Sequence, residues 1–126
     1  MQSMVREVRK SRLAWIAGAV LLVGSVAHAA DAPDKKTERL WKSKCASCHG
    51  ADGKGATDQG KKMAVKDMTT AEWQKKFTDE EIKKGISEGV KRTEGGVKQE
   101  MEAYKDSLKP EQIDALVKYT RTLGPK

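Results

Sequence analysis

Residues 44–50, KCASCHG, constrain the fold of this chain more than any other segment. They contain both cysteines of the 126-residue protein, Cys45 and Cys48, and one of its two histidines, His49. The other histidine, His28, lies in a segment that we expect to be removed. A chain that places its thiols and its remaining imidazole within five positions is organised around that segment.

Residues 1–29 have the pattern of a secretory signal peptide. Four basic residues precede an apolar run at positions 13–27, LAWIAGAVLLVGSVA, which ends in an Ala-x-Ala pattern at Ala27 and Ala29. A membrane-spanning helix needs about 20 apolar residues. The run is shorter than this, which argues against the alternative of an uncleaved membrane anchor. We therefore expect Sec-dependent export, cleavage after Ala29, and a mature domain of residues 30–126 in the periplasm.

The expected mature domain is mildly basic and poor in large apolar side chains. Four of the 25 basic residues and one of the 18 acidic residues lie in the signal peptide, so the domain keeps a net charge of +4. Its charges are scattered, a pattern that favours acidic protein partners over nucleic acid. With one Phe, two Trp and two Tyr, a domain of this length needs a staple or a cofactor to form a stable core.

Cys-x-x-Cys-His is the attachment motif of c-type haem. Residues three positions apart lie on one face of a helix, so both thiols can form thioethers with the vinyl groups of one porphyrin. His49 can then reach the iron, and the haem supplies the missing apolar centre, which couples its binding to folding. We predict one haem c, covalently bound through Cys45 and Cys48, with His49 as an iron ligand.

Three other interpretations of the motif fit less well. A thioredoxin-like redox pair needs a strand–helix setting, and the sequence shows no such strands. A structural zinc site needs four ligands, whereas the mature domain offers three crowded Cys and His residues. A disulfide across two intervening residues would close a very small loop and constrain little of the unfolded chain.

The remainder of the mature domain predicts an all-α fold of about four short helices. We expect helices at 35–48, 69–77, 78–89 and 109–124, separated by loops at 49–62 and 90–104. Asp34 is the expected N-cap of the first helix, and Thr78 with Glu81 forms a capping box for the third. Pro110 and Gly124 stand where proline and glycine begin and end a helix.

The mature domain resembles the small class I cytochromes c, the single-haem carriers of bacterial periplasms. The resemblance covers nearly all of residues 35–123 and rests on CASCHG, on the segment MEAY at 101–104 and on the final amphipathic helix. It implies a class I cytochrome c fold around one haem, in which the first and last helices cross near Trp41, with Tyr119 and Leu116 as its contacts. The chain departs from the family pattern in having Glu102 after Met101 where proline is common.

The distal iron ligand is sought among the methionines, because no second histidine remains after processing. Met63, Met68 and Met101 are the candidates of the mature domain. Met101 lies in a predicted loop just before the last helix, where a thioether can reach the far face of a porphyrin, and the resemblance implies the same residue. Met68 is better explained as a core side chain, and the alternatives to Met101 are another methionine, a lysine or an open site.

A haem held by His49 and Met101 suits electron transfer rather than substrate binding. We therefore expect a monomeric periplasmic electron carrier of a respiratory chain, not an enzyme, with redox proteins as partners and no membrane anchor after processing. Lysines near the haem-bearing segments would steer acidic partners: Lys42, Lys44, Lys54, Lys98 and Lys105. The alternatives are a haem-based sensor or small peroxidase-like enzyme with an open distal site, and a redox subunit of a larger respiratory complex.

Overall fold

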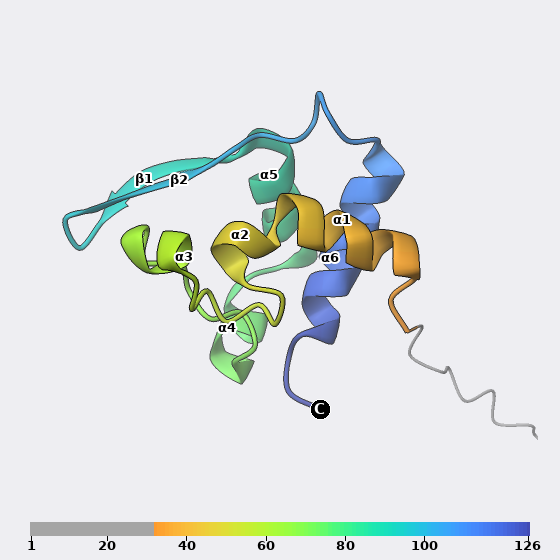
Figure 1. Cartoon of the computed structure of the whole chain (residues 1–126), viewed down its shortest axis with the longest axis horizontal. Coiled ribbons are helices and arrows are strands. Elements are labelled where there is room, and N and C mark those ends of the chain that lie inside the picture. Colours follow the sequence, from red (N-terminus) through yellow and green to blue (C-terminus); the bar gives the residue numbers. More distant parts are fainter. Residues whose placement is uncertain (1–31) are drawn as a thin grey trace, which may run out of the picture.

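The computed structural model describes residues 32–126, so the predicted signal peptide and its cleavage site lie outside the described residues. Along the chain the elements are α1 (Lys35–Lys44), α2 (Ala46–His49), α3 (Asp58–Lys62), α4 (Ala71–Lys76), α5 (Asp79–Glu88), β1 (Val90–Glu94), β2 (Val97–Met101) and α6 (Pro110–Thr122). Helix α6 packs against α1 and α5, and α2 contacts α3 (Figure 1). No helix in this part of the chain is long and apolar enough to cross a membrane.

The helix starts agree with the capping signals in the sequence. The Asp34 carboxylate accepts a hydrogen bond from the Thr37 N–H at 2.8 Å. Thr78 and Glu81 form both hydrogen bonds of the capping box, at 3.2 and 2.8 Å. Pro110 occupies the first turn of α6. These local signals are sufficient because a cap needs only residues within three positions of the helix start.

Two predicted boundaries differ from the structure. The helix expected over 35–48 is interrupted at Cys45, which separates α1 from α2. The loop expected over 49–62 contains the short helix α3, which Thr57 caps by accepting a hydrogen bond from the Gly60 N–H.

We predicted an all-α fold with a loop over 90–104, and the structure instead has two strands in that segment. β1 and β2 form an antiparallel hairpin in which Val90 pairs with Met101 and Glu94 with Val97, and Figure 1 shows it projecting from the helices. Its turn is Gly95-Gly96, with φ of 57° and 79°. Two adjacent positive φ angles are what a tight two-residue hairpin turn requires, and glycine adopts them without strain.

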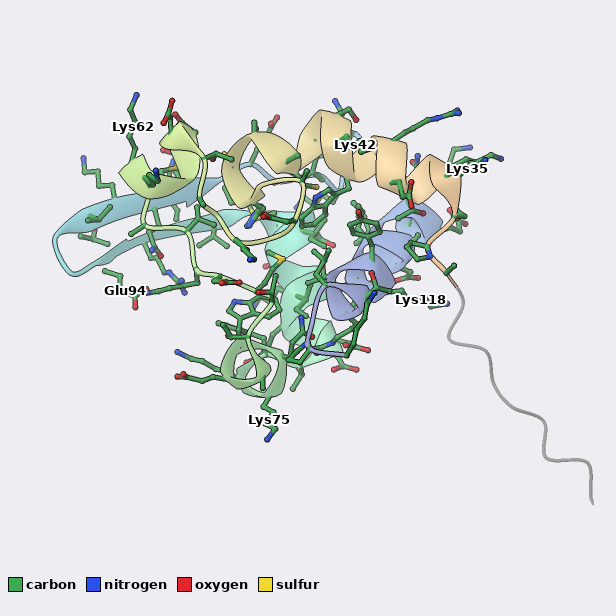
Figure 2. The ribbon with its side chains drawn as sticks, turned by 60° about the horizontal axis from the view of Figure 1, so that its bottom comes forward. Lys35, Lys42, Lys62, Lys75, Glu94 and Lys118 are labelled. Atoms are coloured by element: carbon green, nitrogen blue, oxygen red, sulfur yellow. The ribbon has the colours of Figure 1, made fainter. Side chains whose placement is uncertain are left out.

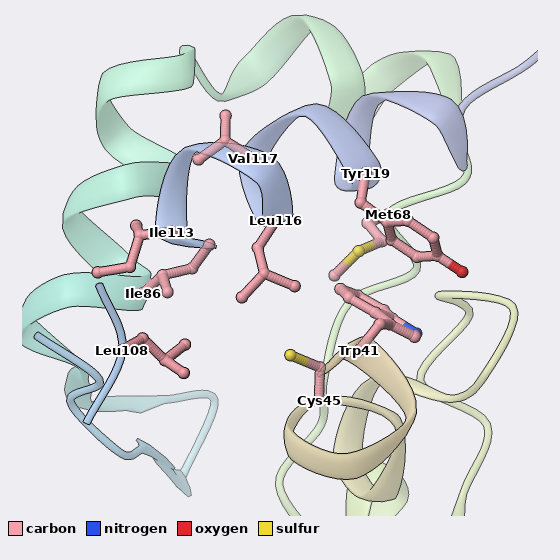
Figure 3. Close-up of a cluster of buried hydrophobic side chains, with 9 residues drawn as sticks. All are labelled: Trp41, Cys45, Met68, Ile86, Leu108, Ile113, Leu116, Val117 and Tyr119. Carbon is pink, nitrogen blue, oxygen red and sulfur yellow. The ribbon is translucent and has the colours of Figure 1, made fainter. Parts of the chain in front are cut away.

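The core lies between the first, fifth and sixth helices and is drawn in Figure 3. Its buried members are Trp41, Cys45, Met68, Ile86, Leu108, Ile113, Leu116, Val117 and Tyr119. The rings of Trp41 and Tyr119 lie 5.1 Å apart, and Leu116 belongs to the same cluster. The contact between the first and last helices that the family resemblance implies is therefore confirmed.

Arg121 joins the last helix to the segment between α4 and α5. Its guanidinium donates to the carbonyl oxygens of Gln74 and Phe77 at 2.7 and 2.6 Å, and to the Asp79 carboxylate at 2.7 Å. Because the two carbonyls lie at the C-terminal end of α4, a cation there also complements the helix dipole.

Gly60 packs against the Cys-x-x-Cys-His motif, and we expect that a methyl group at position 60 would displace the backbone of that motif. A Cβ at Gly60 would lie 2.3 Å from the Gly55 carbonyl oxygen and 2.4 Å from that of Cys48. Both are backbone atoms, so the change Gly60→Ala should lower the free energy of unfolding by about 1–3 kcal/mol, measured by denaturant titration. Gln59→Ala, at an exposed position of the same helix, is the control and should change stability little; equal stabilities of the two variants would contradict this prediction.

Candidate functional site

The interruption of the first helix at Cys45 sets the geometry of the site. Cys45 has φ and ψ of −116° and −37°, and its carbonyl accepts hydrogen bonds from the N–H groups of both Cys48 and His49, at 3.2 and 2.9 Å. One tight turn therefore carries all three residues of the motif. Figure 3 shows the Cys45 sulfur pointing toward the interior of the cluster, on the side of Leu116.

The Cys45 thiol is buried, and burial raises its pKa to about 11, with a further contribution from the nearby Cys48. Both cysteines are free thiols rather than a disulfide. The described residues contain no group of three or more His, Cys, Asp and Glu side chains that could hold a metal ion. The structure therefore favours neither the disulfide nor the zinc interpretation of the motif.

His49 is fixed on one side by Trp41 and by its own backbone. The two rings lie 5.9 Å apart, and the Trp41 indole donates to the Gly50 carbonyl at 3.0 Å. The Gly55 N–H donates to the His49 carbonyl at 2.7 Å. Burial lowers the pKa of the imidazole, so the ring favours its neutral form, which is the form that binds a metal.

The Nδ1 atom of His49 is buried and has no hydrogen-bond partner among the described residues. A histidine that binds a metal through one nitrogen usually donates a hydrogen bond from the other to a carbonyl or carboxylate. Among the described residues the His49 Nδ1 atom therefore has no such acceptor.

These residues open onto one cavity of about 610 Å³. This volume lies within the range of about 300–1,000 Å³ that is usual for cofactor sites. The cavity brings together the predicted ligands Cys45, Cys48, His49 and Met101. The rest of its apolar lining comes from Trp41, Met63, Val65, Met68, Trp73, Phe77, Ile82, Ile86, Val90, Tyr104 and Leu116. A large apolar cavity that carries two thiols, an imidazole and a thioether fits a covalently bound haem.

Met101 reaches the cavity from the end of β2, and a close contact with Gly89 fixes its backbone. A Cβ at Gly89 would lie 2.5 Å from the Met101 carbonyl oxygen, and Gly89 has a φ of 76°. Only glycine satisfies both conditions without strain. The hairpin therefore returns the chain to the helix end from which it left, with Met101 at the cavity wall.

The other two methionines also line the cavity, so lining alone does not select the iron ligand. Met68 is 5% exposed and belongs to the core cluster. A Cβ at Gly53 would lie 3.1 Å from the Met68 Cγ, so this side chain is closely packed. Its position agrees with the expected role of a core side chain.

Sequence reasoning did not place the hairpin residues Arg92 and Gln99 at the cavity, where both lie. Gln99 is 8% exposed; it accepts a hydrogen bond from Arg92 at 2.6 Å and donates to the Ala64 carbonyl at 3.1 Å. The signal that could have revealed them is Gly-Gly flanked by two short segments, which is a hairpin pattern.

The comparisons with known proteins agree with this site. The family model described as Cytochrome c matches residues 35–124. A solved structure named KustC0563 c-type cytochrome is similar to this chain, with a TM-score of 0.60 and 34% sequence identity. That similarity covers 71% of this chain and 98% of the other. A search of curated proteins gave no significant match.

Proposed function

The chain belongs to the cytochrome c family, and on that basis we propose that it is a periplasmic carrier of single electrons. The family implies a covalently bound c-type haem, which supplies one-electron chemistry when bound. We further propose one haem, thioether bonds to Cys45 and Cys48, and iron ligation by His49 and Met101. The protein would act as a monomer between redox proteins of a respiratory chain and would not itself be an enzyme.

The observation that carries this proposal is the shared cavity of the motif and Met101. Cys45, Cys48 and His49 come from one turn, whereas Met101 comes from a hairpin strand more than fifty residues later, and all four line the same apolar space. Protein ligands on both sides leave no position for a substrate at the iron, which suits electron transfer better than catalysis.

Arg92 is the one observation that favours a peroxidase-like alternative, because the sequence alone placed no arginine near the distal side. Its guanidinium is engaged by Gln99 at 2.6 Å and by Glu94 at 3.4 Å. An arginine held in this way is less free to act on a substrate. The two functions are best separated by experiment.

The test uses the matured holoprotein. A haem-stained denaturing gel should show covalent haem, voltammetry should show a reversible one-electron wave, and carbon monoxide should not bind to the reduced protein. Ready binding of carbon monoxide would contradict ligation on both sides, and turnover of hydrogen peroxide would favour the enzyme. Recovery in the periplasmic fraction tests the proposed location.

The basic residues are distributed unevenly along the chain, and this distribution supports the proposal that the protein binds acidic partners. Residues 32–62 hold eight basic and four acidic residues, whereas residues 63–126 hold thirteen and twelve. All six ion pairs of the described residues lie in the second part, between Lys66 and Arg121. Figure 2 shows Lys35, Lys42 and Lys62 along the same edge of the molecule. We call the face of α1 and α3 that carries these lysines the basic face.

We expect this basic face, rather than net charge alone, to govern docking. A carboxylate-terminated electrode is a defined acidic surface, and electron transfer to it should weaken as ionic strength rises. The triple variant Lys35→Glu, Lys42→Glu and Lys62→Glu should bind more weakly than the triple variant Lys75→Glu, Lys76→Glu and Lys118→Glu, which makes the same change of charge elsewhere. Equal weakening in both would contradict the assignment of the face. Of the five lysines expected around the haem, the structure places only Lys44 at the cavity.

A further inference from the structure

The interruption of the first helix leaves one backbone acceptor without its helical donor. In an uninterrupted helix the Lys44 carbonyl would accept from the N–H of Cys48, four residues later. The Cys48 N–H instead donates to the Cys45 carbonyl at 3.2 Å. The Lys44 carbonyl accepts a hydrogen bond from the Tyr104 hydroxyl at 3.0 Å. Tyr104, sixty residues away, thus donates to the carbonyl that the tight turn leaves without a helical donor.

Tyr104 also holds the chain segment that follows Met101. Its backbone N–H donates to the Ile86 carbonyl at 2.9 Å, and the next N–H, of Lys105, donates to the Ser87 carbonyl at 3.1 Å. These hydrogen bonds fasten the segment to the C-terminal turn of α5. The ring lines the cavity beside the motif. One residue therefore connects α5, the segment after β2, and the end of α1.

We propose that Tyr104 is a positioning residue that fixes the separation between Met101 and the haem-attachment turn. This inference rests on the proposed function, because it takes Met101 to be an iron ligand. Met101 is three residues from Tyr104, and the backbone between them is packed against Gly89. The hydroxyl sets how far this segment stands from the turn that carries Cys45 and His49. Without that hydrogen bond, Met101 leaves the iron more often while the fold persists.

The variant Tyr104→Phe removes only the hydroxyl, and Tyr119→Phe is its matched control. Tyr119 is 9% exposed, and its hydroxyl has no hydrogen bond among the described residues. Imidazole, added to the oxidised holoprotein, binds only where the distal ligand has left. We expect Tyr104→Phe to raise the imidazole association constant about fivefold, the factor that one neutral hydrogen bond contributes. Tyr119→Phe should leave that constant at the wild-type value.

The outcomes separate this inference from the proposed function. If Tyr104→Phe binds imidazole as the wild type does, or if both variants change equally, Tyr104 is not a positioning residue. A methionine sulfur bound to ferric haem iron gives a weak far-red absorption band. If Met101→Leu keeps that band, the ligation proposed above fails instead. 3-Fluorotyrosine at position 104 keeps the shape of the side chain and donates more strongly, so it should lower imidazole binding below the wild-type value. An increase or no change in that variant would also overturn the inference.

Discussion

Changing both Cys45 and Cys48 to alanine should give a colourless protein that does not hold the native fold. The two thiols are the only groups of the chain that can form thioethers, so no covalent haem remains. The cavity of about 610 Å³ would then be empty or filled with water. The apolar side chains that line it would lose their packing partner, and a whole domain has only about 5–15 kcal/mol of stability to set against such a loss.

The measurements for the double variant are a haem-stained denaturing gel and circular dichroism of the exported protein. Ser47→Ala is the control, because Ser47 lies between the two cysteines and is exposed. It should stain and unfold like the wild type. A stained band from the double variant would contradict covalent attachment through these residues. A colourless double variant with the wild-type free energy of unfolding would show that the haem is not needed for the fold.

The sequence predicts the parts of this protein that depend on near neighbours. Cys45, Cys48 and His49 lie within five positions, so their motif could be recognised without a structure, and the haem attachment that it predicts is part of the function proposed above. The helix starts at Asp34 and Thr78 depend on hydrogen bonds across three residues. Such short-range interactions leave a direct trace in the sequence.

The parts that sequence reasoning missed depend on residues far apart. The turn at Cys45 breaks a pattern that reads as one continuous helix, and the carbonyl that it frees is taken by a tyrosine sixty residues later. The hairpin was missed because its strands, VKRTE and VKQEM, carry many charged side chains, and its buried polar residue, Gln99, finds a partner in the distant Ala64 carbonyl. Contacts of this kind depend on the tertiary fold.

The identity of the distal methionine could be predicted from the sequence only in part. Composition reduces the candidates to three, and the position before the last helix favours one of them. The structure places all three at the cavity wall, because a side chain that packs on a cofactor and one that binds its metal occupy the same surface. The far-red band of a methionine–iron bond, measured in matched variants of the three methionines, distinguishes the methionine that binds the iron from those that pack against the haem.

Replacing Met101 by leucine should remove the weak far-red band of the oxidised protein and open the iron to carbon monoxide in the reduced one. Leucine keeps nearly the volume of methionine, so the packing changes little, while the sulfur that would bind the iron is lost. The reduction potential should fall, because a His/Met pair raises it. Binding of carbon monoxide should go from undetectable to complete at saturating gas, followed by the visible spectrum.

Met68→Leu and Met63→Leu make the same chemical change at the other two methionines of the cavity and are the controls. Each should keep the far-red band and exclude carbon monoxide, even if Met68→Leu loses some stability, since Met68 is closely packed against Gly53. Retention of the band in Met101→Leu, with its loss in either control, would move the distal ligand to that control's position. Loss in none of the three would mean that the iron takes no methionine, because residues 32–126 contain no other.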